Sequence, residues 1–246
     1  MIIEERPFSI APGVWAHIDF TQRLERRLRG LGGGSVCELG GGARPALDVE
    51  FLRDNKLDCL VVDVSAPELE KAPPGYATLL GDVSSPSFST GEHDGVYDVV
   101  FSRVLAEHVR DARQFHVNVR RLLRPGGIAM HFFPTLWWPP FVANRILPES
   151  LAERILLKIE PWREKSGRAG KFPAFYHWCF GPTNRQVANL LSTGFAVEHC
   201  VAYFGENSHA PGRLLTSLND RWTRYMLSHP NYHFTSYAAY TLRSSR

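Results

Sequence analysis

One short stretch, Val36 to Pro45, constrains the fold of this chain more than any other. It begins as an apolar strand that carries Glu38 near its end, and it continues into a glycine turn at residues 40–42. A helix is expected to open on Pro45, because proline is favoured at the first position of a helix. A strand, a glycine turn and a helix in series form the ligand loop at the carboxyl end of a parallel strand. The stretch therefore predicts a parallel sheet with a small-molecule site at one edge.

The spacing of the glycines and the position of the acid narrow the choice of cofactor. A dinucleotide loop needs a further glycine where Pro45 stands, so that the helix can approach a pyrophosphate closely. The carboxylate of Glu38 would repel a pyrophosphate, but it suits a ligand that carries an ammonium group. An NAD-type dehydrogenase is therefore disfavoured.

Glu38, Gly40 and Gly42 resemble motif I of the class I methyltransferases that use S-adenosylmethionine (SAM), in which an acid ends the first strand and glycines follow at alternate positions. The family's usual further glycine is replaced here by Arg44. The resemblance implies that SAM, which has an ammonium and a sulfonium group and no phosphate, is the cofactor.

Apolar runs alternate with helical patterns along the first half of the chain. Strands are expected at residues 36–39, 57–62, 77–80, 97–101 and 128–133. This alternation predicts a doubly wound α/β domain with a parallel sheet. Two more strands are expected at 195–204 and 237–242, and the resemblance implies that they complete a Rossmann-like sheet of seven mostly parallel strands.

We expect one domain over residues 1–246, with an N-terminal helix within 13–30 and an aromatic-rich insertion at 135–181 after the fifth strand. An insertion at the carboxyl edge of the sheet is where a substrate lid would be built. Its aromatic and histidine side chains are expected to bind the acceptor, the alternative being a hydrophobic core beneath the lid. These candidate acceptor-binding residues are Trp137, Trp138, His177 and Trp178.

Two acids follow the second and third expected strands. A carboxylate at the position of Asp63 can accept hydrogen bonds from both hydroxyls of an adenosine ribose. Asp82, followed by Val83, resembles the family residue that meets the adenine amino group. The less favoured alternative for either acid is a simple turn or cap residue, since Asp is common in turns.

The segment from Asp98 to Asp111, followed by the Arg-Leu-Leu-Arg-Pro-Gly-Gly run at 121–127, resembles the fourth and fifth motifs of the small-molecule, type 11-like branch of the family. That resemblance implies that Ser102 and Arg103 lie close to the cofactor. The Asn/Asp-Pro-Pro-Tyr motif of adenine and glutamine N-methylases is absent from the sequence.

Histidine at position 108 is the first candidate for a general base, because imidazole can accept a proton from an attacking hydroxyl near neutral pH. Its neighbour Glu107 is the second candidate for the same role. A purely structural role for His108 is an equal alternative. Weaker candidates are His17, His131 and His177.

The composition indicates which partners, metal sites and cellular locations are expected for this chain. The formal charge of +3 is spread along the chain, so no nucleic-acid partner is expected. The four cysteines have no metal-ligand spacing and are expected as reduced core residues, and no metal site is predicted. The sequence has neither a signal peptide nor a run of ~18 apolar residues, which predicts a soluble cytoplasmic protein. Its oligomeric state is not defined by any of these patterns.

Together these patterns predict a SAM-dependent methyltransferase that acts on a small-molecule or glycan acceptor, most simply at oxygen. One alternative is a catalytically silent member of the fold that binds SAM or a partner. Another is a peripheral membrane enzyme with a lipid-linked acceptor, suggested by the aromatic run 137–141 and the amphipathic pattern at 154–159.

Overall fold

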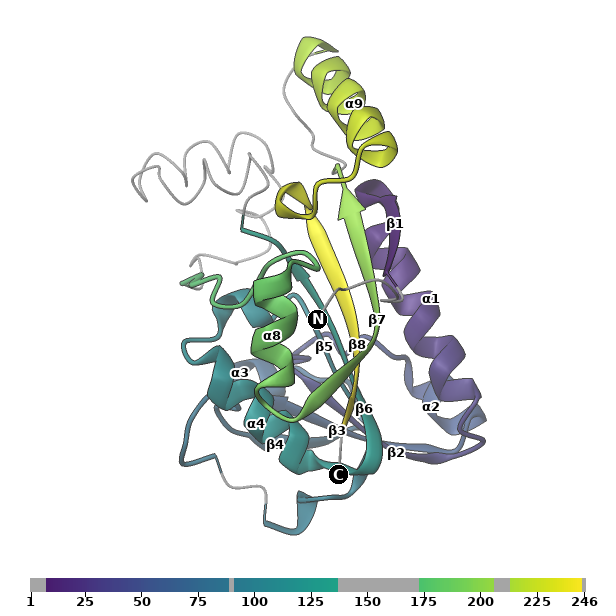
Figure 1. Ribbon diagram of the computed structural model, residues 1–246. Coiled ribbons are helices and arrows are strands. Elements are labelled where there is room, and N and C mark those ends of the chain that lie inside the picture. Colours follow the sequence, from purple (N-terminus) through teal and green to yellow (C-terminus); the bar gives the residue numbers. More distant parts are fainter. Residues whose placement is uncertain (1–7, 89–90, 137–172, 206–212, 245–246) are drawn as a thin grey trace.

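The computed structural model describes residues 8–88, 91–136, 173–205 and 213–244. These residues form one eight-stranded sheet of order β1-β7-β8-β6-β5-β2-β3-β4 (Figure 1). The strands are β1 (Phe8–Pro12), β2 (Gly34–Leu39), β3 (Leu57–Asp63), β4 (Ala77–Leu80), β5 (Tyr97–Arg103), β6 (Leu123–Pro134), β7 (Phe195–Phe204) and β8 (Tyr237–Ser244). The helices are α1 (Ala16–Arg29), α2 (Val49–Asp54), α3 (Ala66–Leu69), α4 (Ala112–Leu122), α8 (Asn184–Leu191) and α9 (Arg213–Ser228), with 3-10 turns η1 (Gly13–Trp15), η2 (Gly91–His93), η3 (Ala106–His108) and η4 (Tyr232–Phe234).

The strand directions place most of the chain's loops at one edge of the sheet. β8 is antiparallel to both of its neighbours, β6 and β7, whereas all the other pairings are parallel. The carboxyl ends of the seven parallel strands therefore meet at one edge, which we call the carboxyl edge. The chain order reverses between β2 and β5, and ligands of doubly wound sheets bind outside the strand ends at such a reversal.

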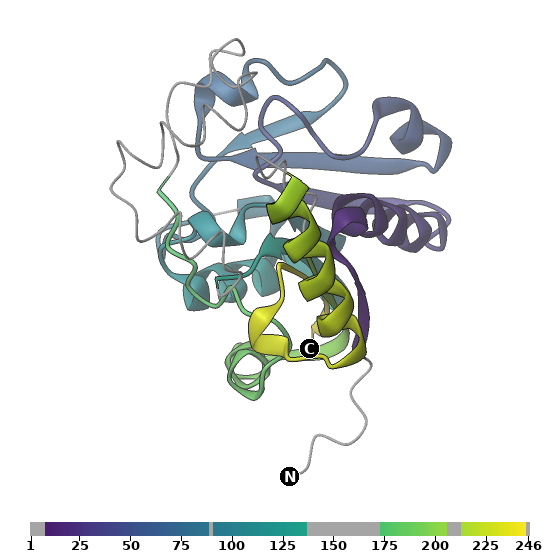
Figure 2. The ribbon, with the colours of Figure 1, turned by 90° about the horizontal axis from the view of Figure 1, so that it is seen from above.

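Helices cover both faces of the sheet. Helices α1 and α2 lie on one face, while α4 and α8 lie on the other (Figures 1 and 2). α1 buries every fourth residue against the sheet, and α4 buries an apolar stripe in the opposite core. The buried stripe residues are Ala16, Phe20, Leu24 and Leu28 in α1 and Phe115, Val119 and Leu122 in α4.

The structure confirms the doubly wound, mostly parallel sheet and the helix within residues 13–30. It also confirms two predicted helix caps, because the Asp111 carboxylate accepts the Gln114 N–H and the Thr183 hydroxyl accepts the Gln186 N–H. The four cysteines are reduced and buried, as predicted.

Two expectations were wrong in detail. The sheet has an eighth strand, β1, which pairs along β7; its short sequence ends in proline and shows no clear alternation. The helix after the glycine turn begins at Val49, not at Pro45. Between them the backbone N–H of Ala46 donates to the Glu38 carboxylate, which directs that amide back toward β2 and delays the helix.

Within the part of the chain that the structure describes, none of the helices combines the length and the apolar character needed to cross a membrane. The predicted location in the cytoplasm is not tested by this finding.

Candidate functional site

The glycine turn after β2 is built from residues in the left-handed region. Gly40 has φ +76° and Gly42 has φ +44°, and side chains larger than hydrogen are disfavoured in that region. The Gly40 N–H donates to the Val62 carbonyl over 2.7 Å, which ties the turn to the end of β3. A Cβ at Gly42 would lie 3.0 Å from Oδ2 of Asp63. The turn and the acid that ends β3 are thus direct neighbours, as expected for one binding site.

Glu38 fixes the glycine turn through a hydrogen bond with the backbone that follows it. Its side chain is 2% exposed, and its two carboxylate oxygens accept the Ala46 N–H over 3.0 and 2.9 Å. Burial raises the pKa of Glu38 to about 7, while the Ala46 N–H and the Arg103 charge act in the opposite direction. The geometry makes Glu38 a residue that shapes the loop; its predicted contact with the cofactor's ammonium stays a prediction.

Asp63 and Asp82 both close small turns with one oxygen. Oδ1 of Asp63 accepts the Ser65 N–H, and Oδ1 of Asp82 accepts the N–H and hydroxyl of Ser84. The Gly81 N–H donates to the Asp63 carbonyl, so the two turns are adjacent. Fixed carboxylates of this kind suit a ligand with hydroxyl and amino donors, such as a nucleoside.

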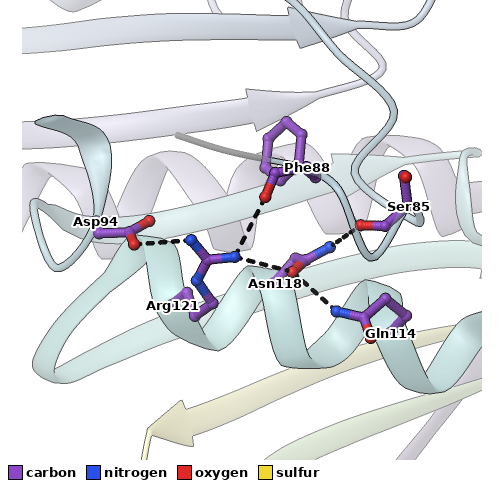
Figure 3. Close-up of polar contacts among 6 residues, drawn as sticks. All are labelled: Ser85, Phe88, Asp94, Gln114, Asn118 and Arg121. Carbon is purple, nitrogen blue, oxygen red and sulfur yellow. Dashed lines mark hydrogen bonds and ion pairs between the residues drawn. The ribbon is translucent and has the colours of Figure 1, made fainter. Parts of the chain in front are cut away.

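A polar network that sequence reasoning missed fastens the loop after β4 to α4 (Figure 3). Asn118, which is 1% exposed, donates through Nδ2 to the carbonyls of Val83 and Ser85, each over 2.9 Å. Arg121 donates to the Phe88 carbonyl and pairs with Asp94 at 2.8 Å. Asn118 therefore sets the position of the Asp82–Val83 turn. The sequence signal that could have identified this network is a polar asparagine among the apolar positions of the expected helix.

Ser102 lies at the end of β5 but faces the core. Its side chain is fully buried, and its hydroxyl is 2.8 Å from Nδ1 of His131 on β6. Burial, followed by the neighbouring His116, lowers the pKa of His131 well below its ordinary value. Both side chains are enclosed beneath the strand ends, so His131 is a poor candidate for the base.

Arg103, the last residue of β5, carries a charge that acts on Glu38 and on His17. Burial raises the pKa of Glu38, and the Arg103 charge partly opposes that rise. Burial lowers the pKa of His17, and the Arg103 charge adds to this shift. The His17 ring stays partly exposed and packs edge-on against Phe132 and Tyr237. The two residues are distant in sequence, but the fold brings the Arg103 charge close enough to act on the His17 pKa.

The η3 turn carries the two candidate bases and is tied to the chain that returns after residue 172. The Glu107 carbonyl accepts the N–H groups of Phe175 and Tyr176 over 2.7 and 3.0 Å. The Glu107 side chain is 2% exposed, and burial raises its pKa to about 8. Its Oε2 has no hydrogen-bond partner among the described residues.

His108 has a defined tautomer in this arrangement. Its Nδ1 is 3.0 Å from the Pro173 carbonyl, which can only accept, so Nδ1 carries the proton. The lone pair of the neutral ring is then on Nε2, which lies 3.7 Å from Oε1 of Glu107. The ring is about one-third exposed. This arrangement allows His108 to take a proton from a group at the carboxyl edge.

Backbone strain gathers around the same turn. Val104, Tyr176 and Trp178 have φ of 55°, 53° and 56°, in the left-handed region that non-glycine residues seldom adopt. Such residues persist only where their surroundings hold them, and they cluster at functional sites. The η3 turn and residues 173–178 therefore form one tightly specified unit.

The predicted acceptor residues divide into two groups. Nδ1 of His177 donates to the Arg110 carbonyl over 2.6 Å, and Trp178 stacks on His116 with ring centroids 5.9 Å apart. Trp178 thus packs at least in part on the core. Trp137 and Trp138 lie outside the described residues, as does most of the predicted insertion.

The residues at this edge fit SAM as a cofactor. The glycine turn leaves no room for side chains beside Asp63, and Asp63 and Asp82 offer carboxylate oxygens suited to a ribose and an adenine amino group. Among the described residues, no group of three or more His, Cys, Asp or Glu side chains is arranged to hold a metal ion.

Comparisons with known proteins agree with this geometry. Residues 38–131, which span the glycine turn through β6, match the sequence family described as Methyltransferase domain. No curated protein sequence matches the chain significantly.

The fold is similar to that of several solved structures. A SAM-dependent methyltransferase from Mesorhizobium loti is 15% identical, with a TM-score of 0.52 over 91% of this chain and 97% of that one. A Thermotoga maritima SAM-dependent methyltransferase, described as a possible histamine N-methyltransferase, is 14% identical, with a TM-score of 0.52 over 94% and 90%. The YcgJ protein of Bacillus subtilis is 12% identical, with a TM-score of 0.55 over 94% and 100%. At these identities the likeness concerns the fold alone.

The family match covers the turn, both acids and the candidate bases, and the fold around them has the strand order that places those residues at one edge. The methyltransferase-domain match over residues 38–131 and the surrounding fold together support a methyltransferase of the class I fold, with S-adenosylmethionine as its cofactor.

Proposed function

We propose that this chain transfers a methyl group from SAM to the oxygen of a small-molecule or glycan acceptor. The observation that carries the proposal is the contact between the Gly42 turn and Asp63 at the carboxyl edge, with His108 in the loop after the adjacent strand β5. Bound SAM supplies a methyl carbon that its sulfonium has already activated.

The chain's own residues have three tasks in such a reaction. The first is to hold the cofactor, which we assign to the glycine turn, Asp63, Asp82 and the Val83 backbone, with Glu38 and Asn118 fixing those elements. The second is to align the acceptor, since orientation of the two reactants supplies much of the rate.

The third task is to accept the proton that an attacking hydroxyl loses. We assign it to Nε2 of His108, because the Nδ1–H to Pro173 bond presents that nitrogen in its basic form. A neighbouring Glu107 with a pKa of about 8 is largely protonated at neutral pH, and it then does not compete for the proton.

The test is a transfer assay with SAM labelled on its methyl group against alcohols, phenols, sugars and amines. Labelled product carrying an O-methyl group is the expected outcome. SAM binding without transfer to any acceptor would favour the catalytically silent alternative. Transfer to amines alone would contradict the assignment to oxygen and the role of His108.

A further inference from the structure

Helix α9 presents an apolar stripe to solvent beyond the carboxyl edge. It projects above the end of β7 in Figure 1, clear of both helical layers. From Thr216 onward, Met226 is the one α9 side chain that is buried. Leu218 is 52% exposed, Trp222 37% and Tyr225 54%. Their spacing of four and three residues puts them on one side of the helix.

Aromatic contacts extend this side of the helix. Trp222 packs edge-on against Phe234 of η4, which is itself 37% exposed, at a centroid distance of 5.9 Å. Trp222 and Tyr225 are 6.3 Å apart. We call Leu218, Trp222, Tyr225 and Phe234 the α9 stripe.

The charges of α9 are distributed unevenly around the stripe. Arg221 and Arg224 are exposed and lie on one side of the stripe, about 60° and about 120° around the helix from its centre, whereas the exposed Asp220 lies almost opposite the stripe. Within the described residues, neither guanidinium forms an ion pair with a carboxylate; Arg224 donates only to the Asp220 backbone carbonyl over 3.4 Å. The stripe therefore has two cations along one of its sides, and Arg221 is the nearer of the two.

We propose that the α9 stripe docks on an anionic lipid surface. Tryptophan and tyrosine favour the boundary between acyl chains and headgroups, and each nearby arginine adds attraction to anionic lipids. A second copy of this chain fits the stripe less well, because an antiparallel two-fold contact would bring the arginines of both copies onto the same side of the interface.

Docking through the stripe would turn the site toward the membrane. β7 runs parallel to β6 and leads to α9, so the helix lies at the same edge as the Gly42 turn and η3. An acceptor held in the lipid surface would then meet the site without leaving the bilayer. Lipid binding itself does not rest on methyl transfer, so the two can be tested separately.

The experiment is flotation of the full chain with vesicles of phosphatidylcholine alone and of phosphatidylcholine with phosphatidylglycerol, at low and at physiological salt. Two double variants test the stripe: Trp222→Ser with Tyr225→Ser, and Arg221→Glu with Arg224→Glu. The matched control is Arg185→Glu with Leu191→Ser on α8, where Leu191 is 47% exposed. Circular dichroism and SAM binding are measured on each variant.

We expect the parent chain and the α8 control to float with anionic vesicles, and more weakly as salt increases. The serine pair should weaken binding about tenfold and the glutamate pair about thirtyfold, with SAM affinity unchanged. Absence of flotation with anionic vesicles, or flotation that survives both double variants, would overturn the proposal. So would a dimer in light scattering that the serine pair abolishes. If a double variant fails to fold, the single change Arg224→Glu at an exposed position serves as the test, and it should also weaken flotation with anionic vesicles.

Discussion

Gly42 and Asp63 lie next to each other at the ends of two adjacent strands: a Cβ added at Gly42 would lie only 3.0 Å from Oδ2 of Asp63. The contact explains why the turn after β2 needs glycine at this position. It also places the glycine turn directly beside Asp63, the acid for which we predict ribose binding.

Replacing Asp63 with alanine should weaken SAM binding by about 1 to 3 kcal/mol, since two ribose hydroxyls lose their acceptor. Isothermal calorimetry on the purified variant measures this directly. Asp58→Ala is the matched control, because Asp58 lies on the same strand and is exposed. Equal affinities for the two variants would remove Asp63 from the site.

Replacing Asn118 with leucine should reduce both stability and SAM affinity. The carbonyls of Val83 and Ser85 lose their donor, which costs about 1 to 3 kcal/mol of unfolding free energy, and the Asp82 turn is released. Gln114→Ala is the control, because Gln114 contacts only the Asn118 side chain in this network. Normal SAM affinity in the Asn118→Leu variant would show that the turn keeps its position without the asparagine.

Replacing His108 with alanine should lower the rate of transfer to a hydroxyl by about 10² to 10⁴, with SAM affinity nearly unchanged. Single-turnover rates over a range of pH separate loss of the base from loss of binding. If His108→Ala keeps full turnover, proton removal belongs to another group, and Glu107→Gln is the next variant to assay.

Glu107 should make the folded chain less stable as the pH rises. Its folded pKa of about 8 lies above the ordinary 4.5, so the folded state favours the protonated carboxyl. The resulting stability is complete below about pH 4.5 and is lost as the pH rises to about 8, by at most about 5 kcal/mol.

Urea unfolding of the parent chain and of Glu107→Gln at pH 5, 7 and 9 tests this expectation. The variant should gain in stability relative to the parent as the pH rises, because glutamine cannot ionise. A constant difference across this range would mean that Glu107 has an ordinary pKa in the folded state.

Trp178→Ala separates a lid residue from a core residue. Because Trp178 stacks on the buried His116, we expect a loss of about 3 to 5 kcal/mol in stability, together with weaker acceptor binding. Melting temperature and SAM affinity, measured on the same samples, distinguish a core role of Trp178 from a role in acceptor binding alone. An unchanged melting temperature with loss of acceptor turnover alone would make Trp178 a pure acceptor contact.

The sequence predicted those features that depend on local pattern. The strand at 195–204 and the caps at Asp111 and Thr183 could be predicted because apolar runs and capping residues act within a few positions. Asp63 could be placed for the same reason, since it ends a buried strand.

Features that depend on contacts between distant segments could not be predicted in this way. The burial of Ser102 against His131 follows from the register between β5 and β6. The late start of α2 follows from a bond between Glu38 and Ala46 that no helix propensity reveals. The effect of the Arg103 charge on the His17 pKa likewise exists only once α1 has packed on the sheet.

The outermost strand, β1, has a consequence for the order of folding. Phe8–Pro12 pairs along Cys200–Phe204, so β1 leaves the ribosome long before the strand that it joins. It cannot pair until β7 has been synthesised, and contacts so distant in sequence form slowly. After β7 has formed and before β1 pairs with it, the outer side of β7 is an open strand edge that another chain can join. A bulky fusion placed directly before Phe8 should therefore delay closure of this edge and promote aggregation during expression, whereas the same fusion after Ser244 should not.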